Sequence, residues 1–114
     1  GEPIEALENP EMVDVPVSLL HPDHYVLQVK GNSMIDEQIH DKDYIVARKT
    51  NTARSGQIVV ALINGEATLK YYVQGPGGVE LHPRNPDFPI IKVDPKDDFH
   101  INGVLLYSFR NYLN

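Results

Sequence analysis

The sequence contains no cysteine in its 114 residues, and its hydrophobic runs are short. Without cysteine there is no disulfide and no thiolate metal ligand, which fits a reducing compartment such as the cytoplasm. The longest aliphatic run, Ile58–Ile63, is far too short to cross a bilayer. The first residues carry neither an initiator methionine nor a signal-peptide pattern, so we expect a cytoplasmic protein without a membrane anchor.

Positive charge is also scarce. Ten Lys and Arg residues stand against 16 Asp and Glu residues, which gives a formal net charge of −6. A DNA-binding surface normally needs a basic stripe, and these residues contain no helix-turn-helix pattern. Any contact with DNA must therefore come from a further segment or from a partner. The length and a hydrophobic content of 41% indicate one folded domain with a modest core.

The first 24 residues differ from the rest because they are rich in acidic residues and in prolines, which stand at positions 3, 10, 16 and 22. Prolines at this spacing prevent a long helix and interrupt sheet ladders. We predict an extended arm over residues 1–24, with a short strand at Val13–Val17, followed by the folded domain over residues 25–114. A solvated tail is the alternative interpretation of this composition.

The remainder of the chain has the alternating pattern of β-strands. Strands are predicted at Tyr25–Lys30, Tyr44–Arg48, Gln57–Ile63, Glu66–Val73, Val79–His82, Ile90–Val93 and His100–Phe109. Asn64-Gly65 is typical of a type I′ hairpin turn. One short turn after Ser33 is the only helical candidate. The predicted fold class is mainly β, with compact, coiled antiparallel sheets and at most short helical turns.

Ser33 is the first candidate for a catalytic role. It lies in Gly31-Asn32-Ser33-Met34, three residues after the strand predicted to end at Lys30. Gly31 permits a tight turn, and consecutive backbone N–H groups in such a turn can stabilise an oxyanion. A serine held in this way can act as a nucleophile. The alternative is an ordinary turn, in which the serine bonds its own backbone.

Lys70 is the second candidate. Alternation along the strand predicted at 66–73 places Thr68, Lys70 and Tyr72 on one face. An exposed lysine on the solvated face of a hairpin is one interpretation. However, both faces of the neighbouring strand at 57–63 are apolar, so we expect the sheet to be covered there. Such cover would lower the pKa of the amine, and a neutral amine can accept the proton of a serine.

Several segments together make a specific pattern, namely Val29-Lys30-Gly31-Asn32-Ser33-Met34-Ile35-Asp36, Asp41-Lys42-Asp43, 56–61, 65–70, 79–83, Asn85 and 103–104. This pattern resembles the LexA/UmuD family of self-cleaving proteins and covers the chain from Tyr25 onward. Lys70 follows Ser33 by 37 residues (70 − 33), a spacing similar to that of LexA. Gln38 and Lys42 depart from the family, which often has glycine there, and this puts the local turn geometry in doubt.

The resemblance implies a serine endopeptidase that acts on itself, with a fold of the LexA/signal-peptidase type. Ser33 would be the nucleophile, Lys70 its general base, and the backbone N–H groups of Asn32 and Ser33 the oxyanion hole. The chain would begin at the point of self-cleavage, an Ala–Gly bond just before Gly1, and the arm would place that bond over Ser33. A glycine left by removal of a tag is the alternative interpretation of Gly1. No metal or other cofactor is implied.

The function implied by the resemblance is that of the self-cleaving and dimerising C-terminal domain of an SOS-response repressor. Its inducer would be a RecA filament on single-stranded DNA, and DNA would be bound only through an N-terminal helix-turn-helix domain. Alternatives are a UmuD-like subunit that binds a lesion-bypass DNA polymerase, a phage repressor domain, or a dimerisation module with a dead site. A signal-peptidase-type enzyme would need a membrane anchor. The apolar strand Val104–Phe109 is the predicted edge of a homodimer.

Other clusters of polar residues are interpreted as structural. His21-Pro22-Asp23-His24 lacks the helical spacing of a metal site, and a loop is favoured. The carboxylates at 36, 37, 41 and 43 lack the spacing of a calcium loop, and we predict a solvated acidic loop. Tyr71 and Tyr72 could stack on bases, but in an acidic chain they are expected to belong to the core and its rim.

Overall fold

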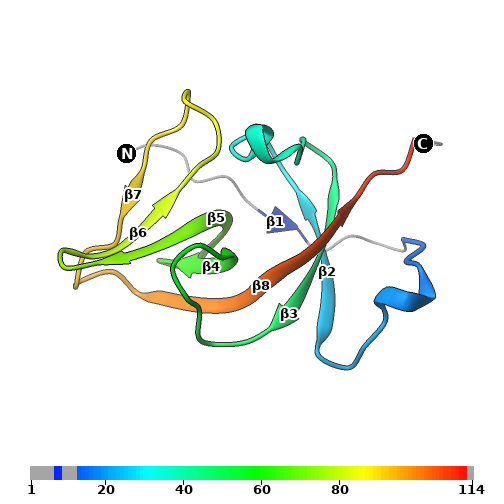
Figure 1. The fold of residues 1–114 in the computed structure, drawn as a ribbon, viewed down its shortest axis with the longest axis horizontal. Helices are drawn as coiled ribbons and strands as arrows, with labels where there is room; N and C mark the ends of the chain where they lie inside the picture. Colours follow the sequence, from blue (N-terminus) through cyan, green and yellow to red (C-terminus); the bar gives the residue numbers. More distant parts are fainter. Residues whose placement is uncertain (1–6, 9–12, 113–114) are drawn as a thin grey trace.

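The computed structural model describes residues 7–8 and 13–112, which form a coiled antiparallel sheet (Figure 1). Its strands are β1 (Leu7–Glu8), β2 (His24–Val29), β3 (Tyr44–Lys49), β4 (Ile58–Ile63), β5 (Glu66–Gly75), β6 (Gly78–His82), β7 (Ile91–Lys92) and β8 (Phe99–Phe109). The described residues add two 3₁₀ turns, η1 (Val17–Leu19) and η2 (Ile35–Glu37). The predicted mainly β fold class is confirmed. In this part of the chain no helix is long and apolar enough to cross a membrane.

Strand β8 joins the two halves of the sheet, whose order in the described residues is β1-β2-β3-β8-β4-β5-β6-β7. The first part of β8 pairs with β4 up to Val104, and the second part pairs with β3 up to Phe109. Both ladders contain a register shift, which bends a strand and increases its twist. In Figure 1, β8 accordingly runs across the molecule from the β4–β7 half to the β1–β3 half.

Strand β4 is covered on both faces, as its apolar sequence predicts. Val60 belongs to a core cluster that includes Met34 and Leu69. Val59 and Ala61, whose side chains point the other way, belong to a second cluster with Tyr72. Because β4 lies between β8 and β5, its backbone is also paired on both sides. The interior of the protein is therefore built around the strand that neighbours Lys70.

The hairpin between β4 and β5 forms at the predicted dipeptide. Asn64 has a φ of 52° and Gly65 a φ of 83°, and a type I′ turn requires positive φ at both central residues. Ile63 pairs with Glu66 directly across this turn. The turn fixes the register of the hairpin, which places Lys70 opposite the fully buried Val59.

The prediction of a strand at Val13–Val17 is wrong. Residues 13–16 lie in no strand, and Val17 begins the 3₁₀ turn η1, in which the Leu19 N–H donates to the Pro16 carbonyl at 2.9 Å. Proline has no N–H to give to a ladder, and Val17 is 82% exposed. The strand of the arm is instead β1, whose Leu7 pairs with Val29 at the end of β2.

Candidate active site

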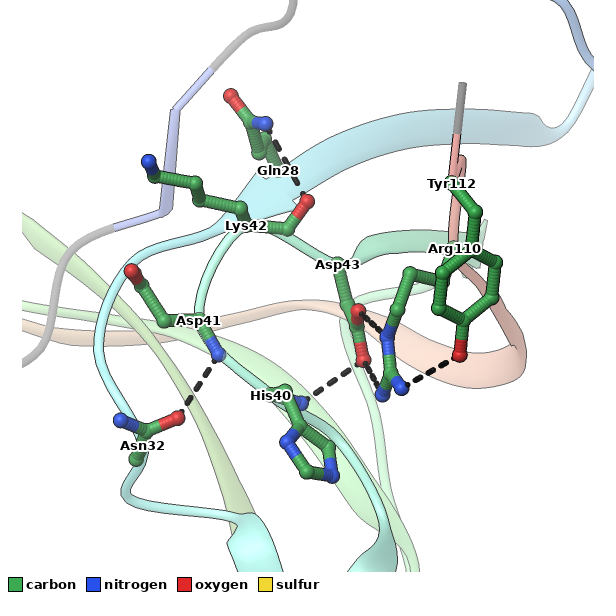
Figure 2. A network of polar contacts seen from close by, with 8 residues as sticks. All are labelled: Gln28, Asn32, His40, Asp41, Lys42, Asp43, Arg110 and Tyr112. Carbon is green, nitrogen blue, oxygen red and sulfur yellow. Dashed lines mark hydrogen bonds and ion pairs between the residues drawn. The ribbon is translucent and has the colours of Figure 1, made fainter. Parts of the chain in front are cut away.

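Ser33 lies in the turn between β2 and η2. Gly31 has a φ of 93°, which an L-residue with a side chain adopts only under strain. The Gly31 N–H donates to Asp41 Oδ1 at 2.7 Å. The Asp41 N–H donates to Asn32 Oδ1 at 2.9 Å (Figure 2). These reciprocal bonds close the turn from both sides. Ser33, next in the chain after Asn32, is fully buried.

Lys70 lies in the middle of β5 and is only 2% exposed. Its Nζ lies 2.9 Å from Ser33 Oγ and 2.6 Å from Thr68 Oγ1. The structure therefore brings together the two side chains that the sequence singled out, although they are 37 residues apart. Removal from water disfavours an ammonium more than a neutral amine. A buried amine within 2.9 Å of a serine hydroxyl has the separation that proton transfer between the two groups requires.

Thr68 is a member of this group to which sequence reasoning assigned no role. It is fully buried, and strand alternation places it on the same face as Lys70. A hydroxyl at 2.6 Å limits the positions that the flexible lysine amine can take. The signal was present in the sequence, because a polar residue two positions before Lys70 must share its face.

The backbone N–H groups of Asn32 and Ser33, the predicted oxyanion hole, belong to this same turn. The next residues lead into η2, where the Ile35 N–H returns to the Asn32 carbonyl at 3.3 Å. Gly1, predicted to follow the scissile bond, lies outside the described residues. The arm reaches the domain through β1, and Leu7 lines an open pocket of about 890 Å³ together with Tyr25, Leu27, Val60 and Ala67. Neither Ser33 nor Lys70 lines this pocket.

Gln38 and Lys42, which stand where the family often has glycine, adopt a backbone conformation that glycine favours. Gln38 has a φ of 62° and Lys42 a φ of 73°, so both lie in the left-handed region. Each non-glycine residue there costs about 1 kcal/mol or more of backbone strain. The segment between Ser33 and β3 is therefore held in its conformation by its contacts rather than by permissive residues.

Asp43 supplies one of these contacts, and the prediction that it lies in a solvated loop is wrong. Its side chain is 3% exposed and pairs with Arg110, with Arg110 Nη2 donating to Asp43 Oδ2 at 2.8 Å (Figure 2). The same oxygen accepts the His40 N–H at 2.8 Å. Burial alone would raise the pKa of Asp43, but the bonds from Arg110 and His40 hold it below its usual value. The other members of the cluster, at 36, 37 and 41, are exposed as predicted.

The loop after β6 also contacts the turn that carries Ser33. The Arg84 N–H donates to the Ser33 carbonyl at 2.7 Å, and the Arg84 carbonyl accepts the Asp36 N–H at 2.8 Å. The guanidinium of Arg84 lies 3.9 Å from the centre of the Tyr71 ring. Sequence reasoning did not find this contact, because nothing local connects a proline-rich loop with a turn some fifty residues earlier.

The histidines make local contacts. The rings of His21 and His24 lie 4.9 Å apart, and His24 Nδ1 is 2.9 Å from the Leu19 carbonyl. His82 pairs with Glu80 on β6. Among residues 7–8 and 13–112, no group of three or more histidine or carboxylate side chains is arranged to hold a metal ion.

Comparison with known proteins gives a consistent result. The sequence matches the Peptidase S24-like family over residues 1–106. It is 46% identical to proteins called LexA repressor from Syntrophotalea carbinolica, Erythrobacter litoralis and Pseudothermotoga lettingae. Each alignment covers 98% of this chain but only 56%, 48% and 58% of the respective relative. The chain thus spans about half the length of the curated relatives it matches, and the resemblance found in the sequence is confirmed.

Proposed function

This chain belongs to the Peptidase S24-like family, and on that premise we propose that it is the self-cleaving C-terminal domain of an SOS-response repressor. The observation that carries the proposal is the buried contact of 2.9 Å between Lys70 Nζ and Ser33 Oγ. The relatives are repressors by name, which favours this role over that of a UmuD-like subunit.

In the proposed reaction, the neutral amine of Lys70 takes the proton of Ser33 Oγ as the oxygen attacks the carbonyl carbon before Gly1. The carbonyl oxygen becomes an oxyanion held by the N–H groups of Asn32 and Ser33. Collapse of this tetrahedral intermediate breaks the C–N bond, and the Lys70 ammonium gives its proton to the Gly1 amine. Water, activated in turn by Lys70, then hydrolyses the acyl ester and frees Ser33.

The arm over residues 1–24 delivers the scissile bond to the domain over residues 25–114. Pairing of β1 with β2 supports this, because it attaches Leu7 to the strand that leads into the Ser33 turn. A substrate on the same chain reacts at high effective concentration. Control then rests on docking of the arm, a population shift that a RecA filament on single-stranded DNA would favour. DNA binding belongs to an upstream helix-turn-helix domain, in keeping with the net charge of −6.

The proposal is tested by extending the chain upstream of Gly1 with a repressor-type segment that ends in alanine. Incubation at alkaline pH should release a fragment that begins at Gly1, identified by intact mass. The reaction should follow first-order kinetics at a rate that does not depend on protein concentration, because it is intramolecular. Ser33→Ala should abolish it. Scission that persists in Ser33→Ala would refute the assignment of the nucleophile.

We also propose that the second half of β8 forms a homodimer edge. From Leu105 to Phe109 this strand pairs with β3 on one side, and within the described residues no strand pairs with it on the other. Leu106 is 37% and Tyr107 48% exposed there. A free edge with apolar side chains pairs readily with a second copy across a two-fold axis.

Sedimentation at micromolar concentration should show a dimer for the parent chain. Tyr107→Lys should raise the dissociation constant of the dimer at least about tenfold, since a charge on an edge strand opposes pairing. Val17→Lys is the matched control, because Val17 is also exposed and apolar but lies in η1. A parent chain that sediments as a monomer would contradict this part of the proposal.

A further inference from the structure

Besides an ion pair between Arg84 Nε and Glu37 Oε1 at 3.3 Å, the loop after β6 makes three hydrogen bonds to the segment that contains Ser33 and η2. In two of them, the Arg84 N–H donates to the Ser33 carbonyl and the Arg84 carbonyl accepts the Asp36 N–H. The third comes from a side chain: Asn85 Nδ2 donates to the Asn32 carbonyl at 2.8 Å. The two residues are 53 positions apart in the sequence. Asn85 thus reaches the residue immediately before the proposed nucleophile.

We propose that Asn85 is a positioning residue that sets the oxyanion hole. The carbonyl of Asn32 and the N–H of Ser33 are the two ends of one planar peptide group. A bond that fixes the carbonyl therefore also fixes the direction of the N–H. Of the two bonds that this carbonyl accepts, the one from Asn85 is the shorter, at 2.8 Å against 3.3 Å from the Ile35 N–H. The bond from Asn85 further draws electron density toward the carbonyl oxygen, which makes the N–H a stronger donor. The inference rests on the proposed function, in which this N–H holds the oxyanion.

The side-chain amide of Asn85 is itself oriented. Its Oδ1 accepts the Asp87 N–H at 2.9 Å, which leaves Nδ2 facing the Asn32 carbonyl. Only an amide supplies an acceptor on one side and a donor on the other in this shape. An ionised aspartate would present acceptors alone, and one of them would face the carbonyl oxygen.

Because Arg84 attaches the loop through its backbone, the role of the Asn85 side chain can be tested without detaching the loop. The backbone bonds of Arg84 do not involve the Asn85 side chain, so they hold the loop against the turn when this side chain is changed. The guanidinium of Arg84 adds a contact of 3.9 Å to the Tyr71 ring. A substitution at Asn85 therefore alters the orientation of one peptide while the attachment of the loop persists.

The upstream-extended chain provides the test, with self-scission rates measured across the alkaline range for Asn85→Ala and Asn85→Asp. We expect the plateau rate to fall about tenfold in Asn85→Ala and further in Asn85→Asp, since loss of an oxyanion donor itself costs on the order of 10²–10³-fold. The pH midpoint should stay within a few tenths of the parent value, because Lys70 is untouched. Asp87→Ala, an exposed change that keeps the backbone bond to Asn85, should cleave at the parent rate.

The order of the two variants separates positioning from packing. Aspartate has the shape of asparagine, so a packing role predicts that Asn85→Asp is the milder change. Rates are compared at a temperature where circular dichroism shows each variant folded. Rates within twofold of the parent, the opposite order, a shifted midpoint, or failure of both variants to fold would each overturn the inference. A parent chain that does not cleave at all would instead count against the proposed function.

Discussion

Replacing Lys70 with methionine should abolish the proposed self-scission at every pH and leave the protein folded. The amine is the proposed acceptor of the Ser33 proton, and the two atoms lie 2.9 Å apart. General-base catalysis contributes about 10²–10⁴-fold, and the loss is larger when the nucleophile depends on its base for activation. We expect the rate to fall by at least about 10³-fold. Methionine has a similar volume and no amine to desolvate, but the buried hydroxyls of Ser33 and Thr68 lose a partner. The free energy of unfolding should therefore fall by no more than about 3 kcal/mol.

The pH dependence of the self-scission rate in the parent chain tests the same role of Lys70. Only an unprotonated amine can accept a proton, so under the proposed mechanism the rate of self-scission should rise with pH. Lys70→Arg should be as inactive as Lys70→Met, because a guanidinium stays protonated throughout this range. Lys92→Met on β7 is the matched control, since that lysine is exposed and should not affect the rate. Quenched time courses at several pH values measure all four proteins. Any pH-dependent scission left in Lys70→Met would assign the base to another group.

The strands could be predicted from the sequence because their signals are local. Alternation and the Asn64-Gly65 turn located β4 and β5, and this register alone determines that Lys70 faces the same way as Val59. The exception, Val13–Val17, has β-branched residues but no partner strand among the described residues. A strand forms only where its backbone groups find a ladder, and sequence propensity does not report this.

The meeting of Ser33 with Lys70 could not be predicted from pattern alone. It depends on a turn closed by Asp41 and Asn32, and on a loop that attaches through Arg84. These contacts join segments that are far apart in the chain, and the residues that make them are ordinary polar ones. Only the family resemblance linked the two candidates before the structure did. Contacts between distant segments leave no local signal, so the sequence predicts an exposed Asp43 although Arg110, its partner 67 residues away, buries it.

Asp43→Ala should lower the free energy of unfolding by about 2 kcal/mol. The substitution removes a carboxylate that is 3% exposed, and it leaves the His40 N–H without its acceptor. It also removes the partner of Arg110, which follows directly after β8. Chemical denaturation at neutral pH measures the change. Asp14→Ala is the matched control, because Asp14 is exposed and should have little effect. An unfolding free energy equal to that of the parent would mean that the pair between Asp43 and Arg110 contributes nothing to stability.

The same pair predicts how stability depends on acid. The bonds from Arg110 and His40 hold the pKa of Asp43 below its usual value despite its burial. A carboxyl group whose pKa is lower in the folded state stabilises the protein above its unfolded pKa of about 3.9. That contribution is lost as the pH falls through the lower, folded value. The parent should therefore lose its stability advantage over Asp43→Asn as the pH falls below about 4, with the two denaturation midpoints converging. Asp43 ends the segment that begins at Ser33, so acid should also loosen the proposed catalytic turn. Its amides should then lose their extra protection from hydrogen exchange relative to Asp43→Asn at the same pH. A constant gap between the two midpoints down to pH values of about 2 would show that Asp43 is not the group that links acid to stability.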